Sequence, residues 1–243
     1  MRLRQTVLVV EDMEPLAAAF CGILGTQVSF RDPHIAEFGA ENVMLPVGDT
    51  FLELITPLHD DSAAARYLRR NGDGGYMALV QVDDVEAARR RVTEAGMRTI
   101  YESRRETMRG FHIHPKDVGG AILALDEAHP PESWAFAGPW EAVKQTGAVS
   151  EITAIELAVP EPDVTAANWE TALGRARTVV GGTVIALDRG EVRFVRGTHD
   201  SIVTVDLAAP RPAEVLTAAE AHGAEVDHDR FALAGVHFRV RTP

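Results

Sequence analysis

The sequence has little of several features that define whole classes of protein. Cys21 is the only cysteine, so no disulfide can form within the chain, which is typical of proteins from reducing compartments. No apolar run is long enough to cross a bilayer, and the start, MRLRQTVLVVEDMEP, reaches charged residues too soon for a secretory signal. We therefore expect a cytoplasmic protein without a membrane partner.

Basic residues are also scarce. The chain has 24 Lys and Arg against 36 Asp and Glu, a net charge of −12, and no basic cluster interleaved with aromatic residues. Nucleic acid is therefore not an expected partner. Apolar residues make up 46% of the 243 positions, which is enough for the core of one or two domains.

What the sequence does contain is a repeated pattern of apolar runs. Four segments with helical spacing each end at a glycine, namely Gly25, Gly96, Gly174 and Gly223. A strand-like run precedes each helix, and shorter β-prone runs follow it, such as TQVSF, NVMLPV and TFLELI after the first. The pattern predicts an α+β fold of four βαβββ modules, whose curved mixed sheets surround a cavity for a small ligand.

A stretch rich in proline and tryptophan interrupts the repeats. The segment EAHPPESWAFAGPWEAVKQTG has no strand period and predicts a linker at residues 128–149. We expect Trp134 and Trp140 to dock this linker onto a domain rather than to line a ligand entrance. The linker would separate an N-terminal domain, residues 1–127 with modules at 3–57 and 75–127, from a C-terminal domain of two shorter modules, residues 150–243.

Three motifs in residues 3–127 resemble the vicinal oxygen chelate superfamily. They are the ELITP run after a Gly-Asp turn, the VDDVEAA helix start that leads to EAG, and HPKDVGG before the final strand. Within the superfamily, the chain is similar to methylmalonyl-CoA epimerase and glyoxalase-type members. The resemblance implies two paired-repeat domains and, in many members, a divalent metal in the cup of the sheet.

The positions that hold this metal in the superfamily are altered here. The resemblance places Gln5, Glu53, Met77 and Ala124 at the four ligand positions of the first domain. One carboxylate and one amide do not supply the three protein ligands of an open catalytic site, and Met and Ala are unfit for a hard ion. We therefore expect no metal and no other cofactor. A displaced site that draws on Glu53, His34, His112 and His114 is a weaker alternative.

The corresponding positions of the second domain hold Ala154, Arg193, Thr204 and Arg239. Two arginines would repel a cation. One interpretation is a positive inner face that binds an anionic ligand. The interpretation we favour is a degenerate domain, in which the arginines pair with Glu156, Glu191 and Asp206.

Glu53 is the first catalytic candidate. Its apolar neighbours in the expected cup are Phe51, Ile55, Met77 and Leu79, which should raise the pKa of its carboxyl and allow proton exchange near neutral pH. Gln5 should lie within its reach across the cup. The alternative is a structural carboxylate that pairs with Arg4 or Arg109.

His112 is the second catalytic candidate. It shares a strand face with His114, because alternate residues of a strand point the same way. The alternative is a cavity-wall histidine that is bonded to a neighbour. The side chains that we expect to contact a ligand are Gln5, Phe51, Met77, Leu79 and Ala124.

Two functions fit an apolar cup with a few polar groups. The first is a metal-independent isomerase or lyase that acts on a small carbonyl-containing or aromatic metabolite, with Glu53 as the proton-transfer group. The alternative is non-catalytic binding of a small molecule, as in the resistance-type members that sequester a compound. A homodimer is a further expectation, since edge strands of such cups often pair.

Overall fold

The computed structural model describes residues 1–179 and 181–243, which form two compact units. The first unit comprises Met1–Arg4, Tyr76–Ala135 and Thr153–Val203. The second comprises Gln5–Gly75, Phe136–Ile152 and Thr204–Pro243. The sequence predicts a different division, with one domain before and one after a linker at residues 128–149. That division stays a prediction.

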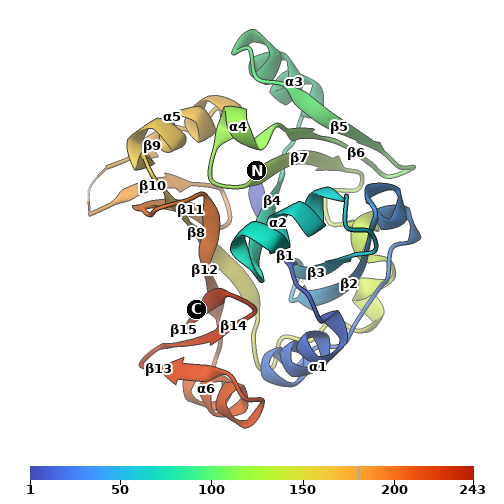
Figure 1. Ribbon diagram of the computed structural model, residues 1–243, viewed down its shortest axis with the longest axis vertical. Helices are drawn as coiled ribbons and strands as arrows, with labels where there is room; N and C mark the ends of the chain where they lie inside the picture. The colour runs from blue at the N-terminus through green and yellow to red at the C-terminus, as the bar shows by residue number, and fades with distance from the viewer. Residues whose placement is uncertain (180) are drawn as a thin grey trace. The chain divides into compact units, whose positions relative to one another are not determined.

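The elements follow the predicted order of strand, helix and three strands (Figure 1). One complete module consists of β4 (Gly74–Gln81), α3 (Val85–Glu94), β5 (Thr99–Arg104), β6 (Met108–Ile113) and β7 (Ile122–Ala128). The next consists of β8 (Glu151–Val159), α5 (Pro162–Leu173), β9 (Arg177–Thr178), β10 (Thr183–Ala186) and β11 (Glu191–Arg196). The last consists of β12 (Ser201–Ala208), α6 (Pro212–Ala221), β13 (Glu225–Asp227), β14 (Arg230–Leu233) and β15 (Val236–Arg241).

The first module departs from the pattern. It contains β1 (Arg2–Val9), α1 (Met13–Leu24), β2 (Ala40–Val47) and β3 (Thr50–Pro57). In the described chain, the predicted strand TQVSF is replaced by an isolated bridge between Phe30 and Met44. The α+β class and the mixed sheets are confirmed.

The first unit contains two groups of paired strands, each with both parallel and antiparallel neighbours. Strand β4 runs parallel to β7, which pairs antiparallel with β6, and β6 pairs antiparallel with β5. Strand β8 runs parallel to β11, which is followed by the antiparallel strands β10 and β9. Helix α3 buries Val85, Ala88 and Val92, and its Arg89 guanidinium lies 4.8 Å from the centre of the Phe111 ring. Phe111 therefore faces α3, and alternation along β6 turns His112 to the opposite face.

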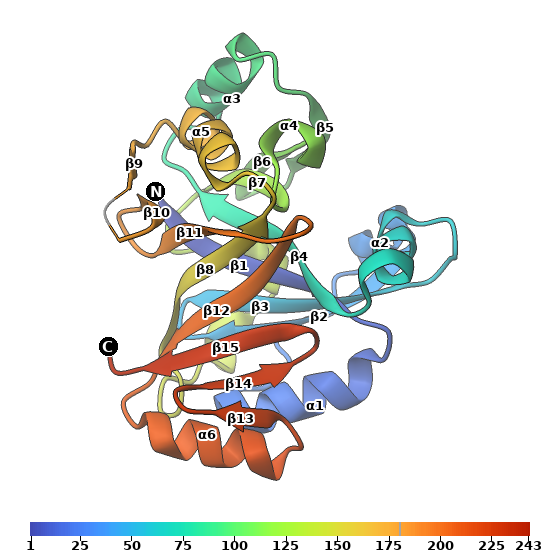
Figure 2. The same cartoon turned by 60° about the vertical axis from the view of Figure 1, so that its left-hand side comes forward.

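The second unit also contains two such groups of paired strands. Strand β3 lies between β1, to which it is parallel, and β2, with which it forms an antiparallel hairpin. Strand β12 runs parallel to β15, and β15, β14 and β13 follow in antiparallel order. Helix α6 lies alongside β13 in both views, next to α1 (Figure 2). The Phe20 ring of α1 meets the Phe238 ring of β15 edge-on at 5.2 Å, which helps to join these helices to the sheet.

The remaining elements are short. They are the 3₁₀ helices η1 (Pro33–Phe38), η2 (Ala135–Ala137) and η3 (Trp140–Ala142), and the α-helices α2 (Ala63–Asn71) and α4 (Pro115–Val118). Trp134 and Trp140 keep only 1% and 4% of their surface exposed, as the docking interpretation of the linker requires. Among the described residues, no helix combines the length and the apolar content that a membrane span needs.

The hairpin between β2 and β3 depends on a glycine. Gly48 has a φ of 62°, and a Cβ at this position would lie 1.9 Å from the carbonyl oxygen of Ser150. Gly223 has a φ of 81° and nothing within 4 Å of such a Cβ. Both positions carry the left-handed penalty of roughly 1–2 kcal/mol for an L-residue, but only Gly48 adds a backbone collision.

We therefore expect Gly48→Ala to lower the free energy of unfolding by clearly more than Gly223→Ala. Urea denaturation of the two variants and the parent chain measures the difference. Equal losses in the two variants would contradict the collision at Ser150.

Candidate functional site

A buried carboxyl lies in the second unit between two amide side chains. Glu53 on β3 is aligned with Val7 of the parallel strand β1, and Gln5 lies two residues earlier on the same face of β1. The Gln5 amide Nε2 donates a hydrogen bond of 2.6 Å to Glu53 Oε2. The structure therefore brings together the two polar residues that the sequence places at the first two ligand positions.

Asn42, which the sequence analysis missed, holds the other oxygen of this carboxyl. It lies on β2, the hairpin partner of β3, and its Nδ2 donates a 2.6 Å hydrogen bond to Glu53 Oε1. Its own carbonyl oxygen accepts from the backbone N–H of Asp32 at 2.8 Å. This second bond fixes which end of the amide faces Glu53. The signal available in the sequence is a single asparagine within the apolar strand NVMLPV.

Burial controls the ionisation of Glu53. The residue keeps 5% of its surface exposed, and desolvation is the largest cause that raises the pKa of its carboxyl to about 7. The hydrogen bonds from Asn42 and Gln5 oppose this shift because they favour the ionised form, while the nearby charge of Asp32 adds to it. Near neutral pH, both the protonated and the ionised carboxyl are therefore populated.

The alternative arginine partners of Glu53 have other contacts. Arg109 pairs with Glu127, with 3.4 Å between Nη2 and Oε1. Arg4 donates to the carbonyl oxygen of Glu132 at 2.7 Å, and its guanidinium lies 5.3 Å from the centre of the Trp134 ring. The Glu53 carboxyl accepts its hydrogen bonds from the amides of Gln5 and Asn42.

Phe51, a predicted ligand contact, lies two residues before Glu53 on the same face of β3. Its ring meets the Trp140 ring edge-on at 5.2 Å. The docked linker therefore packs next to the strand that carries Glu53.

The other predicted site residues lie in the first unit. Leu79 of β4 and His112 of β6 both align with Ala124 of β7, so the three side chains share one face of this sheet, and Met77 precedes Leu79 by two residues. Their grouping with Gln5, Phe51 and Glu53 around one pocket stays a prediction.

His112 is a neutral imidazole at physiological pH. Burial lowers its pKa to about 4, and its ring lies 4.8 Å from that of Tyr101. A neutral ring can accept a proton only at acidic pH, which makes it a weak general base but a good hydrogen-bond partner. His114 has a structural contact, because its Nδ1 accepts from the backbone N–H of Lys116 at 3.1 Å at the start of α4.

The residues at the superfamily's metal positions do not fit a divalent metal. Both oxygens of Glu53 accept hydrogen bonds from amide N–H groups, and neither Met77 nor Ala124 offers an oxygen or nitrogen ligand. Within residues 1–179 and 181–243, no three His, Cys, Asp or Glu side chains are grouped closely enough to hold a metal ion.

The arginines at the corresponding positions of the second half are neutralised by carboxylates. Arg193 Nη1 lies 3.1 Å from Glu191 Oε1, and its Nε lies 3.7 Å from Glu156 Oε2. In the second unit, Arg239 Nη1 lies 3.5 Å from Asp206 Oδ1. These ion pairs confirm the pairing that was favoured over a site for an anionic ligand.

A second buried carboxyl was also missed. Asp126 of β7 is completely buried, and desolvation raises its pKa to about 7 against the lowering effect of a 3.3 Å hydrogen bond from the Ser103 hydroxyl. Its carboxyl lies over Gly110, where a Cβ would be 1.8 Å from Oδ1. In the sequence, Asp126 looks like the polar end of the apolar strand GAILALDE.

Comparisons with known proteins show the family of this chain. The model of the glyoxalase-like domain matches residues 6–173. Human mitochondrial methylmalonyl-CoA epimerase is 35% identical over 134 residues, which cover 52% of this chain and 74% of that protein. An ethylmalonyl-CoA/methylmalonyl-CoA epimerase from Cereibacter sphaeroides is 31% identical over 133 residues, 52% of this chain and 97% of that protein.

One solved structure is similar along the whole chain. The crystal structure of a hypothetical protein from Staphylococcus aureus superposes with a TM-score of 0.72 over 100% of this chain and 99% of that one. The two sequences are 9% identical, so this likeness concerns the fold alone.

The two buried carboxyls predict how stability depends on pH. In the unfolded chain, Glu53 and Asp126 titrate near their ordinary pKa values of 4.5 and 3.8, whereas each folded pKa is about 7. At pH values between the unfolded and the folded pKa, the folded protein therefore binds more protons than the unfolded chain does. Stability is therefore highest at the acidic end of this window and falls as the pH rises to about 7, by on the order of a few kcal/mol per group.

We expect Glu53→Gln and Asp126→Asn each to flatten this decline. Urea denaturation at a series of pH values from 4.5 to 8 measures the slope. The account of both groups is wrong if the parent chain gains stability across this range.

Removal of the hydrogen bond between Asn42 and Glu53 should lower the stability of the protein by an amount that depends on pH. Asn42→Ala removes a donor that favours the ionised form of Glu53, so the pKa of Glu53 should rise further and the loss should be larger at pH 8 than at pH 5.5. At pH 8 we expect a loss of about 1.5–3 kcal/mol, the range for hydrogen bonds to charged groups.

A matched control is Asn71→Ala, since Asn71 is exposed and its side chain donates to the Tyr67 carbonyl at the end of α2. Denaturation of both variants at the two pH values separates the effects. A pH-independent loss for Asn42→Ala would show that its bond to Glu53 does not affect ionisation.

Proposed function

Because the chain belongs to the glyoxalase-like domain family, we propose that it is an isomerase that moves a proton at the carbon next to a carbonyl group, with Glu53 as the proton-transfer residue. The family match covers residues 6–173, and about half of the chain is homologous to methylmalonyl-CoA epimerases. The proposed reaction uses a side chain of this protein and no metal, because the ligand positions do not fit one.

The observation that carries this proposal is the ionisation of Glu53. A general base works best when its pKa lies near the operating pH, since it is then often ionised and still takes up a proton readily. Burial raises the pKa of Glu53 to about 7, whereas an exposed glutamate would titrate near 4.5. The two amide donors keep this pKa from rising further, so a useful fraction of the carboxyl stays ionised.

The amides also position the carboxyl. Gln5 Nε2 and Asn42 Nδ2 each hold one oxygen at 2.6 Å, which limits rotation about the last bond of the Glu53 side chain. Each carboxylate oxygen has a second lone pair that can accept a proton from carbon. In the proposed step, Glu53 takes the proton from the carbon next to the carbonyl, and the electron pair of the C–H bond moves into an enolate. A proton from solvent is then added to the opposite face of that carbon, which inverts its configuration, and Glu53 releases its own proton to solvent.

The relatives suggest the first substrates to assay. Their names specify methylmalonyl-CoA and ethylmalonyl-CoA, thioesters in which an acidic C–H bond lies between two carbonyl groups. We propose that the substrate of this chain shares this feature, a C–H bond made acidic by an adjacent carbonyl.

The proposal is tested by exchange with deuterated water. Incubation of the parent chain with methylmalonyl-CoA, ethylmalonyl-CoA and small 2-substituted oxo acids should bring deuterium from the solvent into at least one of them. Glu53→Gln should reduce the exchange rate by about a hundredfold or more, the usual contribution of a general base, while binding persists. Mass spectrometry measures the exchange, and calorimetry measures the binding.

The alternative function is binding without chemistry. A specific observation favours it, because Glu53 is 5% exposed and both of its oxygens already accept hydrogen bonds. Binding of a carbonyl compound without any deuterium exchange, and with only a change of affinity in Glu53→Gln, would support sequestration over isomerisation.

A further inference from the structure

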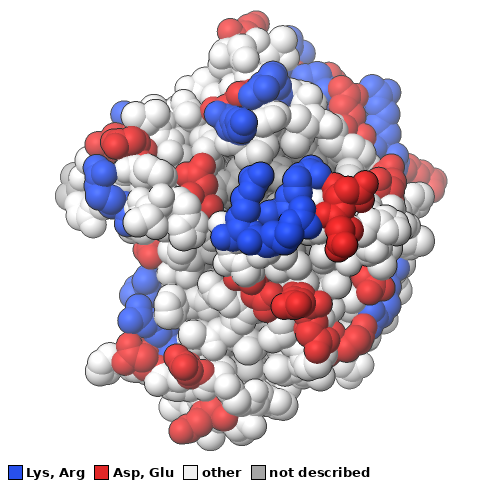
Figure 3. All heavy atoms as spheres, viewed as in Figure 1, with Lys and Arg blue, Asp and Glu red and all other residues white. Residues whose placement is uncertain are grey.

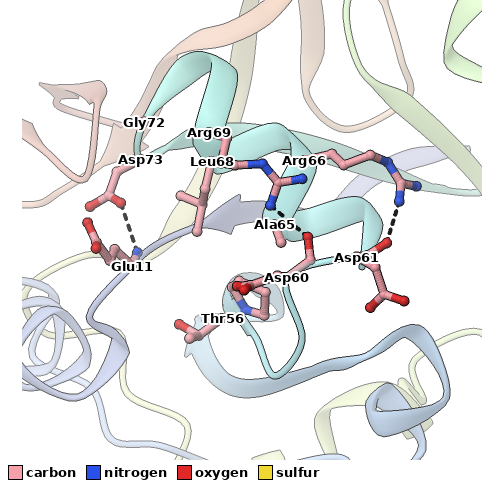
Figure 4. A pocket seen from close by; sticks show the side chains of 11 residues that line it. Glu11, Thr56, Asp60, Asp61, Ala65, Arg66, Leu68, Arg69, Gly72 and Asp73 are labelled. Carbon is pink, nitrogen blue, oxygen red and sulfur yellow. Dashed lines mark hydrogen bonds between the residues drawn. The ribbon is translucent and has the colours of Figure 1, made fainter.

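A pocket beside α2 in the second unit is lined by side chains of both charges. Figure 3 shows basic side chains over α2 with acidic side chains directly beside them, and Figure 4 shows Asp60 and Asp61 next to Arg69 and Arg66. Arg69 donates to the backbone carbonyl oxygen of Asp60 at 2.6 Å, and Arg66 donates to that of Asp61. Because both signs of charge lie together, this lining favours no class of ligand. The open edge of β5 in the first unit is more specific.

Strand β5 is the last strand of its group (Figure 1). In the described chain it pairs with β6 alone, so its other edge is open. Arg105 and Met108 exchange backbone hydrogen bonds where β5 turns into β6. Hydrogen-bonded and non-hydrogen-bonded pairs alternate in an antiparallel ladder. Ser103 therefore also bonds to β6, whereas the N–H and C=O groups of Glu102 and Arg104 point away from it.

This edge is accessible and short. Glu102 and Arg104 are exposed, and the apolar Ile100 keeps 47% of its surface exposed. A register shift in the ladder between Thr99 and Tyr101 ends the regular edge on that side. Free backbone groups on an edge strand are a template for another strand. Because the regular edge is short, a partner strand has few positions at which it can pair.

Ion pairs hold the charged side chains of β5 on one face. Arg89 Nη1 of α3 lies 2.5 Å from Glu102 Oε1, and Arg104 Nη2 lies 3.4 Å from Glu102 Oε2. Glu102 and Arg104 therefore both stand on the face that α3 covers. A strand added to the edge would meet both charges on this face.

The order of the charges fits a second copy of the same strand. Two copies of β5 related by a two-fold axis pair antiparallel. With Ser103 facing Ser103 of the second copy, Glu102 lies opposite Arg104 of that copy, twice by symmetry. Opposite charges at facing positions stabilise a strand pair, and like charges destabilise it. Glu102 or Arg104 at the axis would instead face its own like charge, so the charges select the register centred on Ser103.

Another edge strand lacks this complementarity. In the described chain, β13 of the second unit pairs with β14 alone, and its residues are Glu225, Val226 and Asp227. Every two-fold pairing of β13 that keeps the hydrogen-bond phase sets an acidic residue opposite an acidic one. That edge repels its own copy, whereas the edge of β5 attracts it.

We propose that the chain forms a homodimer by antiparallel pairing of β5 with β5 of a second copy, with Ser103 at the two-fold axis and Glu102 opposite Arg104. The sequence led us to expect a homodimer but specified neither the strand nor the register. The proposal is independent of Glu53 and of the proposed isomerase activity.

Charge reversal tests the register. Arg104→Glu sets acidic residues opposite each other and Glu102→Arg sets basic residues opposite each other, so each variant alone should dimerise at least about tenfold more weakly than the parent chain. A mixture of the two variants should form a heterodimer, because both facing pairs are then of opposite charge. Arg90→Glu is the matched control, since it makes the same charge change at an exposed position of α3.

Sedimentation velocity over a range of protein concentrations measures the association, and circular dichroism verifies that each variant is folded. A parent chain that stays monomeric would overturn the proposal. So would an Arg104→Glu variant that dimerises as well as the parent chain, or a mixture of the two folded variants that does not associate.

A disulfide tests the position of the axis. Facing residues of a non-hydrogen-bonded antiparallel pair have Cα atoms about 4.5 Å apart, within the range of roughly 4.4–6.8 Å that a disulfide requires. Ser103→Cys, in a chain that also carries Cys21→Ala, should therefore cross-link two copies under mild oxidation. Arg104→Cys in the same background is the control, because its Cα lies about 7–8 Å from that of its own copy on the diagonal. Failure of Ser103→Cys to cross-link, or equal cross-linking of both variants, would contradict the register.

Discussion

The central interaction of this structure is a carboxyl that is buried and still hydrogen-bonded at both oxygens. Burial alone would keep Glu53 protonated at neutral pH, and the two amide donors alone would keep it ionised. Because desolvation is the larger of these effects but is opposed by both amides, the pKa of Glu53 comes to about 7. A group with this pKa exchanges protons under physiological conditions, and the proposed chemistry follows from that property.

Three strands are needed to build this environment. The parallel pairing of β1 with β3 brings Gln5 to one oxygen, and the antiparallel pairing of β2 with β3 brings Asn42 to the other. The backbone N–H of Asp32 then fixes the Asn42 amide from outside the sheet. The resemblance to the vicinal oxygen chelate superfamily implies that Gln5 and Glu53 stand at metal-ligand positions, whereas both Glu53 oxygens accept hydrogen bonds from amide N–H groups.

Much of this fold is predictable from the sequence because each helix carries local signals. Gly25 ends α1 with a left-handed φ of 63°, and the Asp84 side chain caps α3 by accepting from the Ala87 N–H. Ion pairs such as Arg193 with Glu156 follow from residues at matching positions of neighbouring strands. Asn42 was missed because its contact depends on the register of the β2–β3 hairpin, which local patterns do not specify.

The most direct test of this account is an infrared measurement of Glu53 itself. A protonated carboxyl has a carbonyl stretching band that an ionised one lacks, and the difference between the parent chain and Glu53→Gln isolates the band of Glu53. The account predicts a band that is strong at pH 5.5, half as strong near pH 7 and absent at pH 9, because the pKa of Glu53 is about 7. A band already lost by pH 5.5 would mean that Glu53 titrates like an exposed glutamate, and the proton-transfer proposal would lose its foundation.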